Sequence, residues 1–196
     1  MLIWDDIYSD DEYVYGKTPN DFLAQNIDLL KPGKVLCIAD GEGRNSVYLA
    51  KQGFEVTAVD SSRVGLEKAA RHADEQGVSV NFVHCDLADF SFDANEWDSI
   101  VSIFCHLPPP LRRQTHAGVV QGLVKDGIFL LEAYTPEQIN YGTGGPPTTE
   151  LMVSLEMLGQ ELDALETIHQ QEIVRDVVEG SKHNGTASVV QLIARR

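Results

Sequence analysis

The stretch VLCIADGEGRNSVYLA, residues 35–50, joins an apolar run, a turn with two glycines, and a segment whose apolar residues have helical spacing. The run VLCIA is apolar at every position, which predicts a strand covered on both faces. Gly41 and Gly43 lie in the turn, where a Cβ would obstruct the approach of the backbone to a ligand. The stretch therefore predicts the first strand, ligand-binding turn and helix of an α/β sheet that binds a nucleotide-like molecule.

Alternation of strands and helices continues after this unit. Apolar, β-branched or aromatic runs predict further strands at residues 54–59, 78–83, 97–104 and 127–134. Such alternation indicates parallel strands with right-handed crossovers. Beyond residue 134, a loop rich in glycine and proline, a short helix and two strand-like stretches predict a terminal hairpin. The predicted fold is α/β: a Rossmann-like, doubly wound sheet of seven strands, mostly parallel, with a C-terminal antiparallel hairpin.

The chain has 196 residues, which suffices for one domain with a substantial core. We expect residues 1–33 to form an N-terminal helical cover over the sheet. Residues 34–134 are then the ligand-binding core, and residues 135–196 supply a lid loop, a helix and the terminal hairpin.

Composition restricts the partners of the chain. The chain has thirty acidic and fifteen basic residues, which give a formal charge of −15. Binding of nucleic acid or of acidic lipid requires a basic face, so we expect neither partner. The N-terminal residues lack the basic and apolar regions of a secretory signal, which predicts a cytoplasmic protein. We expect a small-molecule partner, and a chain that acts as a monomer or a homodimer.

Three cysteines, Cys37, Cys85 and Cys105, lie far apart in the sequence and lack the spacing of metal ligands. We therefore expect neither a disulfide framework nor a bound metal.

Acidic residues follow three successive predicted strands. Asp40 precedes Gly41 and Glu42 follows it, so a pyrophosphate in this turn would meet two carboxylates. Asp60 ends the second predicted strand, where a carboxylate accepts hydrogen bonds from ribose hydroxyls. Asp86 follows the third strand and is placed to bind an adenine amino group. The pattern favours a cationic adenosine ligand without phosphate over a nicotinamide dinucleotide.

The motif series VLCIADGEGRNSVYLA, VTAVDSS, HCDLADF, WDSIVSIFCHL and LVKDGIFLLEAY resembles that of class I S-adenosylmethionine-dependent methyltransferases. With WDDIYSDDEYVYGKTPNDFL upstream, it looks closest to the tellurite-resistance and thiopurine-methyltransferase branch. The resemblance implies S-adenosylmethionine as cofactor and in-line methyl transfer to a small molecule. The family commonly has an acid two residues before the first glycine of its motif. Asp40 directly precedes that glycine here, and we expect it to hold the methionine ammonium group instead.

The resemblance also implies that residues at the ends of the first four strands contact the cofactor. These residues are Asp40, Gly41, Gly43, Asp60, Ser61, Asp86, Leu87 and Ile103. The two glycines would face the methionine portion, Asp60 the ribose, and Asp86 with Leu87 the adenine. Tyr15 and Arg44 are expected to close over the cofactor.

Three residues are candidates for the acceptor pocket. His106 follows the fourth strand, Tyr8 lies in an aromatic N-terminal segment, and Arg175 lies in the predicted hairpin. Plainer interpretations stay open: a histidine bonded to the backbone, an aromatic that packs a helix on the sheet, and a solvated strand end. The loop YGTGGPP, residues 141–147, has glycine hinges and stiff prolines, as a lid does.

Methyl transfer requires orientation of the acceptor and exclusion of water more than side-chain chemistry, so the lack of a catalytic triad does not argue against an enzyme. We therefore expect a methyltransferase. Two alternatives stay open: a non-catalytic S-adenosylmethionine sensor or partner subunit, and an NAD(P)-dependent oxidoreductase.

Overall fold

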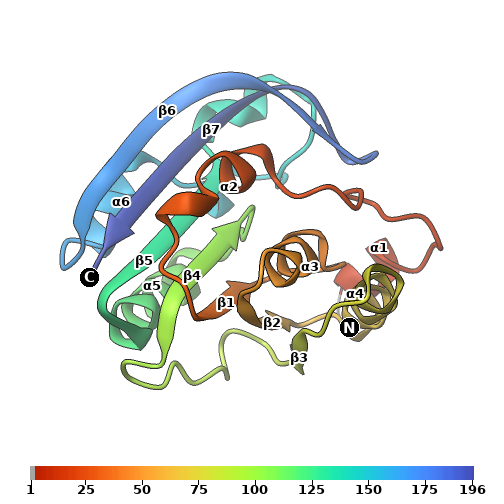
Figure 1. Ribbon diagram of the computed structural model, residues 1–196. Coiled ribbons are helices and arrows are strands. Elements are labelled where there is room, and N and C mark those ends of the chain that lie inside the picture. The colour runs from red at the N-terminus through yellow and green to blue at the C-terminus, as the bar shows by residue number, and fades with distance from the viewer. Residues whose placement is uncertain (1–2) are drawn as a thin grey trace.

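The computed structural model describes residues 3–196, and Leu2 and Met1 of the expected N-terminal cover lie outside the described residues. Seven strands form one sheet in the order β3-β2-β1-β4-β5-β7-β6 (Figure 1). Neighbours from β3 to β5 run parallel, and β7 pairs antiparallel with both β5 and β6. The strands are β1 Lys34–Ile38, β2 Glu55–Asp60, β3 Asn81–His84, β4 Trp97–Ile103, β5 Leu123–Tyr134, β6 Glu166–Glu179 and β7 His183–Arg195. The predicted fold class is confirmed.

Helices cover both faces of the sheet. The α-helices are α1 Ile3–Ile7, α2 Asp21–Gln25, α3 Arg44–Lys51, α4 Arg63–Gln76, α5 Pro109–Gly122 and α6 Leu155–Glu161. Short 3-10 helices span Ile27–Leu29, Pro136–Asn140 and Thr149–Leu151. In Figure 1, α2 and α3 lie in front of the sheet, whereas α5 and α6 lie behind it.

Alternation along β1 explains why this strand is apolar throughout. Val35 and Cys37 belong to the core under α2 and α3, and Leu36 and Ile38 belong to the core under α5 and α6. Successive side chains of a strand point to opposite faces, so a strand with two covered faces needs apolar residues at every position. The same reasoning holds for β4, which is next to β1, and for β5, which is next to β4, both in the interior of the sheet.

The third strand differs from its predicted span of residues 78–83. It begins only at Asn81, because the backbone N–H of Val78 donates to the Ala73 carbonyl (3.1 Å) and closes the end of α4. The strand lies at the sheet edge and its side chains are not fully buried.

An ion cluster joins α5 to α6. Arg112, which is 6% exposed, donates through Nε and Nη2 to the Glu161 carboxylate at 2.8–3.1 Å. His116 Nδ1 lies 2.7 Å from the same carboxylate. Burial opposes ionisation of Glu161, but the hydrogen bonds from His116 and Arg112 outweigh it and lower its pKa to about 2. Arg112 therefore belongs to the face of α5 that packs on α6, whereas its neighbour Arg113 is exposed.

Within residues 3–196, no helix combines the length and the apolar character that crossing a membrane requires.

Replacement of Arg112 by glutamine should lower the free energy of unfolding by about 2–3 kcal/mol, because it leaves a buried carboxylate without its bidentate partner. Arg113 is exposed on the same helix, so Arg113→Gln should change it by less than about 0.5 kcal/mol. Urea denaturation of both variants measures the difference. Equal effects would show that the cluster contributes nothing to stability.

Candidate functional site

A cavity of about 770 Å³ lies at the carboxyl ends of the parallel strands. Its wall includes Asp40 after β1, Asp60 at the end of β2, Asp86 after β3 and Ile103 at the end of β4. This edge is where open α/β sheets bind ligands, beside the reversal of strand order between β1 and β4. The wall also includes other residues predicted for the site: Tyr8, Tyr15, Arg44, Ser61, Leu87 and His106.

Asp40 connects the turn after β1 to helix α3. Its carboxylate accepts hydrogen bonds from the Ser46 hydroxyl and from the Ser46 backbone N–H (3.3 Å). Burial raises the pKa of Asp40 to about 6, with a contribution from the nearby Asp60 carboxylate and an opposing one from Ser46. The raised pKa shows that the Asp40 carboxylate is poorly solvated, and a poorly solvated carboxylate gains from pairing with a cation in the cavity.

Asp60 holds the same turn from the second strand. One carboxylate oxygen accepts from the Gly41 N–H at 2.8 Å, and the other accepts from the Ser62 N–H at 2.7 Å. Burial raises the pKa of Asp60, and these two backbone hydrogen bonds oppose the increase. Asp60 therefore organises the turn while its side chain also lines the cavity.

The two glycines of the turn do not line the cavity, although both were expected to face a ligand. Gly41 has a φ of +61°, and a Cβ there would lie 2.6 Å from the Tyr8 hydroxyl. Gly43 has a φ of +86°, and its Cβ would lie 2.6 Å from the Cβ of Ala69 on α4. The glycines thus permit a left-handed backbone and close packing by Tyr8 and α4. Their contribution to the site is the shape of the turn.

Glu42 does not oppose a phosphate in the way its position in the sequence suggests. It is 4% exposed and forms an ion pair with Nζ of Lys68 on α4 at 2.5 Å. Lys68, which is 1% exposed, also donates to the carbonyls of Asp10 (2.7 Å) and Glu12 (2.6 Å). Lys68 thus neutralises Glu42, and it was not predicted because a lysine among the residues of an amphipathic helix gives no signal of burial.

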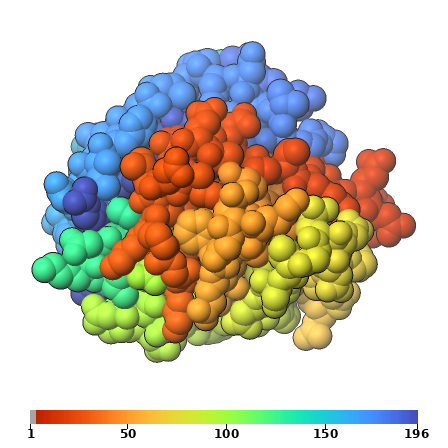
Figure 2. Space-filling view, viewed as in Figure 1, coloured from red at the N-terminus to blue at the C-terminus, as the bar shows by residue number. Residues whose placement is uncertain are grey.

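The N-terminal segment is held over the cavity by these contacts. The other Glu42 oxygen accepts from the Tyr15 N–H at 3.3 Å, and the Ser62 hydroxyl donates to Asp5 at 2.6 Å. On the opposite side, the Ser181 N–H donates to the Val14 carbonyl at 2.9 Å. Figure 2 shows the segment, in red, between the blue β6–β7 hairpin and the yellow α4.

Arg44, the first residue of α3, has one buried nitrogen without a hydrogen-bond partner among the described residues. Its Nη2 donates to Glu179 of β6 at 2.7 Å, and its buried Nη1 has no partner among the described residues. The side chain is 8% exposed and lines the cavity. An unpaired guanidinium N–H beside a cavity is suited to bind a carboxylate.

His106 lines the cavity as a neutral imidazole. Its Nδ1 lies 3.2 Å from the Leu151 carbonyl, which places the proton on Nδ1 because a carbonyl only accepts. Its ring stacks on Tyr134 with centroids 5.4 Å apart. Burial lowers the pKa of His106 to about 4, despite the hydrogen bond to Leu151.

Tyr8 lies in the cavity wall, with its hydroxyl close to Gly41 in the turn after β1. Burial and the Asp60 carboxylate raise its pKa well above the usual value, so it is a neutral phenol at every physiological pH.

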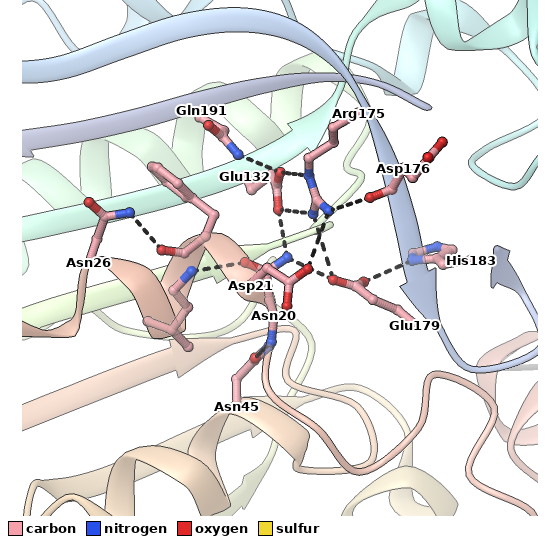
Figure 3. A network of polar contacts seen from close by, with 12 residues as sticks. Asn20, Asp21, Asn26, Asn45, Glu132, Arg175, Asp176, Glu179, His183 and Gln191 are labelled. Atoms are coloured by element: carbon pink, nitrogen blue, oxygen red, sulfur yellow. Dashed lines mark hydrogen bonds and ion pairs between the residues drawn. The ribbon is translucent and has the colours of Figure 1, made fainter. Parts of the chain in front are cut away.

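Arg175 was predicted to contact the acceptor, but it is not part of the cavity wall. Its Nε and Nη2 donate to the two oxygens of Glu132 at 2.8 and 2.7 Å (Figure 3). Glu132 of β5 is fully buried, and a buried carboxylate requires such a partner. Asn20 also donates to Glu132 and to Glu179. The signal for this network was the single acid in the apolar run GIFLLEAY, which the sequence analysis did not use.

The loop predicted as a lid contributes residues 144–147 to the wall but is tied to the hairpin. The Thr143 hydroxyl donates to the Thr186 carbonyl at 2.6 Å. Gln138 donates to Thr143 (3.1 Å) and to the Gly144 carbonyl (3.1 Å). Any closure of this loop would have to break these bonds.

Replacement of Lys68 by methionine should lower the free energy of unfolding by about 3 kcal/mol, because Glu42 would remain buried without a partner. It should also release residues 8–16 to limited proteolysis. Lys51→Met, at an exposed position of α3, is the matched control and should leave both quantities close to wild type. An unchanged cleavage pattern in Lys68→Met would contradict the role assigned to Lys68.

Comparison with known proteins adds sequence evidence to this geometry. Residues 35–127 match a family of methyltransferase domains. The ubiquinone biosynthesis O-methyltransferase of Actinobacillus pleuropneumoniae is 32% identical over 98 residues, which cover 46% of this chain and 42% of the relative. The glycine/sarcosine N-methyltransferase of Halorhodospira halochloris is 29% identical over 134 residues, 66% of this chain and 49% of the relative. The chain thus matches somewhat less than half the length of these relatives.

Among solved structures, TehB from Haemophilus influenzae is similar with a TM-score of 0.76 over 98% of this chain and 67% of that protein. The identity is 17%, so the likeness is one of fold. From β1 into β5, the chain therefore carries the sequence pattern of a methyltransferase domain.

Proposed function

We propose that this chain binds S-adenosylmethionine and transfers its methyl group to a small molecule. One observation carries the proposal: acids from three successive strand ends, Asp40, Asp60 and Asp86, meet in the wall of a single cavity. The match of residues 35–127 to methyltransferase domains supports the same conclusion. When bound, the cofactor would supply an electrophilic methyl group on a cationic sulfur.

The residues of the wall fit this cofactor. Asp40 and the unpaired Nη1 of Arg44 suit the ammonium and carboxylate of an amino-acid group, because they offer opposite charges beside the same turn. Asp60 with Ser61 is assigned to the ribose hydroxyls. Asp86 with Leu87 is assigned to the adenine, and Ile103 supplies an apolar surface in the same wall.

The protein's own contribution to methyl transfer is orientation and exclusion of water. The N-terminal segment places Tyr8 and Tyr15 in the cavity wall, and the contacts of Lys68 hold that segment. Aromatic faces in such a wall favour a cationic sulfur. A closed, poorly hydrated cavity also strengthens the interaction of Asp40 with a cation.

Two alternatives to a methyltransferase are an NAD(P)-dependent oxidoreductase and a non-catalytic S-adenosylmethionine sensor. With Glu42 neutralised by Lys68, the case against a dinucleotide rests on Asp40, whose carboxylate faces the cavity without a basic partner among the described contacts. A non-catalytic sensor would use the same cofactor residues, so a transfer assay must separate it from an enzyme.

The acceptor class and the branch remain proposals. One relative is named as an O-methyltransferase and another as an N-methyltransferase, so the relatives are compatible with either oxygen or nitrogen as the acceptor atom. The likeness of TehB favours the tellurite-resistance branch only at the level of fold. We propose a small-molecule acceptor and a monomer or homodimer, consistent with the net charge of −15, which disfavours polyanionic partners.

Calorimetric titration should show binding of S-adenosylmethionine and none of NADH. Asp40→Asn should weaken S-adenosylmethionine about 10–100-fold, because it removes one charge-assisted hydrogen bond. The control Asp89→Asn changes an exposed acid in the loop after β3 and should leave the affinity unchanged. Binding of NADH alone would overturn the proposed cofactor. Transfer of radiolabelled methyl to a panel of small acceptors then distinguishes an enzyme from a sensor.

The affinity for S-adenosylmethionine should fall as the pH is lowered below about 6. Because the pKa of Asp40 is raised to about 6, this carboxylate is ionised at pH 7 and mostly protonated at pH 5, where it no longer attracts a cation. One pH unit below the pKa, the affinity should be about 10-fold weaker. Asp40→Asn should abolish this dependence. 5′-Methylthioadenosine lacks the amino-acid group, so its affinity should vary much less over the same range.

A further inference from the structure

A second histidine, His183, lies in the cavity wall beside a buried carboxylate. His183 is the first residue of β7, is 7% exposed, and lines the cavity. Its Nδ1 lies 3.5 Å from Oε2 of Glu179, the last residue of β6 (Figure 3). A carboxylate only accepts, so the proton of the neutral ring belongs on Nδ1 and the lone pair on Nε2.

The carboxylate of Glu179 is held in place by groups other than His183. Arg44 Nη2 donates to it at 2.7 Å, and Asn20 Nδ2 donates to it at 2.8 Å. Desolvation opposes ionisation of Glu179, but the adjacent His183 ring and the hydrogen bonds from Arg44 and Asn20 lower its pKa to about 2. Glu179 is therefore charged at all relevant pH values and can orient the imidazole and stabilise its protonated form.

Aromatic rings surround His183. Tyr15 lies 4.4 Å from it between ring centroids, Phe104 4.7 Å and Tyr134 5.3 Å. Phe104 and Tyr15 also line the cavity, as do Pro146 and Pro147 of the neighbouring loop. This end of the cavity is thus shaped for a flat, apolar molecule.

His183 is better suited than His106 to accept a proton. Burial lowers the pKa of both, but Glu179 acts against the decrease at His183, whereas His106 faces only a backbone carbonyl. Glu132 also raises the pKa of His183, and Arg44 lowers it. In addition, the buried ring nitrogen without a hydrogen-bond partner among the described residues is Nε2 in His106, whereas in His183 it is Nδ1, the nitrogen that faces Glu179. His106 consequently contributes to the shape of the pocket, and His183 replaces it as the candidate proton acceptor.

We propose that the Glu179–His183 pair takes a proton from a neutral hydroxyl or amine on an aromatic or heteroaromatic ring, which is the methyl acceptor. The proposal rests on the proposed function. A lone pair on Nε2 recognises an O–H or N–H donor and offers nothing to an inorganic oxyanion or a halide. The net charge of −15 also disfavours anionic acceptors.

The step conserves atoms and charge. The acceptor oxygen or nitrogen forms a bond to the methyl carbon and loses its proton to Nε2 of His183. The electrons of the broken carbon–sulfur bond stay on the sulfur, which becomes a neutral thioether. The imidazolium, stabilised by Glu179, then releases the proton to solvent. His183 is the catalytic residue and Glu179 a positioning residue.

The test uses 4-nitrophenol, whose phenolate absorbs visible light, on the full chain saturated with S-adenosylhomocysteine. At pH 6 we expect the probe to bind, with a ratio of phenolate to phenol at least about 10-fold above that in His183→Gln, equivalent to one pKa unit. Glu179→Gln should lower the same ratio. Asn184→Ala, at the exposed neighbouring position, is the matched control and should behave as wild type.

Methyl transfer from radiolabelled S-adenosylmethionine gives a second readout. His183→Gln should slow transfer to 4-nitrophenol or 4-nitroaniline about 100-fold without changing cofactor affinity. Added imidazole should restore part of the rate.

Several results would overturn the inference. They are failure of both probes to bind wild type, equal ionisation in wild type and His183→Gln, or transfer to tellurite and iodide but to neither ring compound. The wild-type ionisation measurement decides the matter even if a variant does not fold. Calorimetry with the cofactor comes first: absence of binding there refutes the proposed function, whereas binding without ring-compound recognition refutes this inference alone.

Discussion

The ion pair between Arg44 and Glu179 joins the two parts of the chain that enclose the cavity. Arg44 begins α3, directly after the turn that follows β1, and Glu179 ends β6 near the C-terminus. Both side chains are buried, so each has lost its hydration and depends on the other. Such a pair contributes little net stability over apolar packing, but it fixes the position of the β6–β7 hairpin relative to the turn after β1. The orientation of His183 follows from it, because the same carboxylate faces its ring.

Other buried charges follow the same rule. Glu132 is paired with Arg175, Glu161 with Arg112 and His116, and Glu42 with Lys68. Each pair connects elements far apart in the sequence, and together they account for acids that would otherwise be costly to bury. Asp40 and Asp60 differ, because hydroxyl and backbone N–H groups bind them instead of basic side chains. These two carboxylates therefore remain able to interact with a cation.

The cavity wall combines two chemically distinct sets of residues, and this combination is the basis of the proposed activity. Acids at the strand ends form one set, to which a cationic adenosine compound is proposed to bind. Aromatic rings and two neutral histidines form the other, to which an acceptor is proposed to bind. Residues of the N-terminal segment and residues 144–147 also belong to the wall, where they would help to shield both reactants from water. Methyl transfer gains from such shielding, since it depends on alignment of two bound molecules.

The sequence by itself determined the fold class, the edge of the sheet at which the cavity lies, and the acids that meet in the cavity wall. Strands that are apolar at every position indicate a sheet covered on both faces. Residues that follow parallel strands must gather at one edge of that sheet, so the local sequence pattern alone predicted that Asp40, Asp60 and Asp86 lie in the same cavity wall. Only the tertiary structure decided which charges are neutralised. Glu42 pairs with Lys68, Arg175 with Glu132, and Glu179 with Arg44, which lie 26 (68 − 42), 43 and 135 positions away, and spacing along a chain carries no information on such contacts. That is why Gly41 and Gly43 proved to serve packing, why Arg175 proved to lie outside the cavity, and why only the structure shows that His183, four residues after Glu179, lies in the cavity wall.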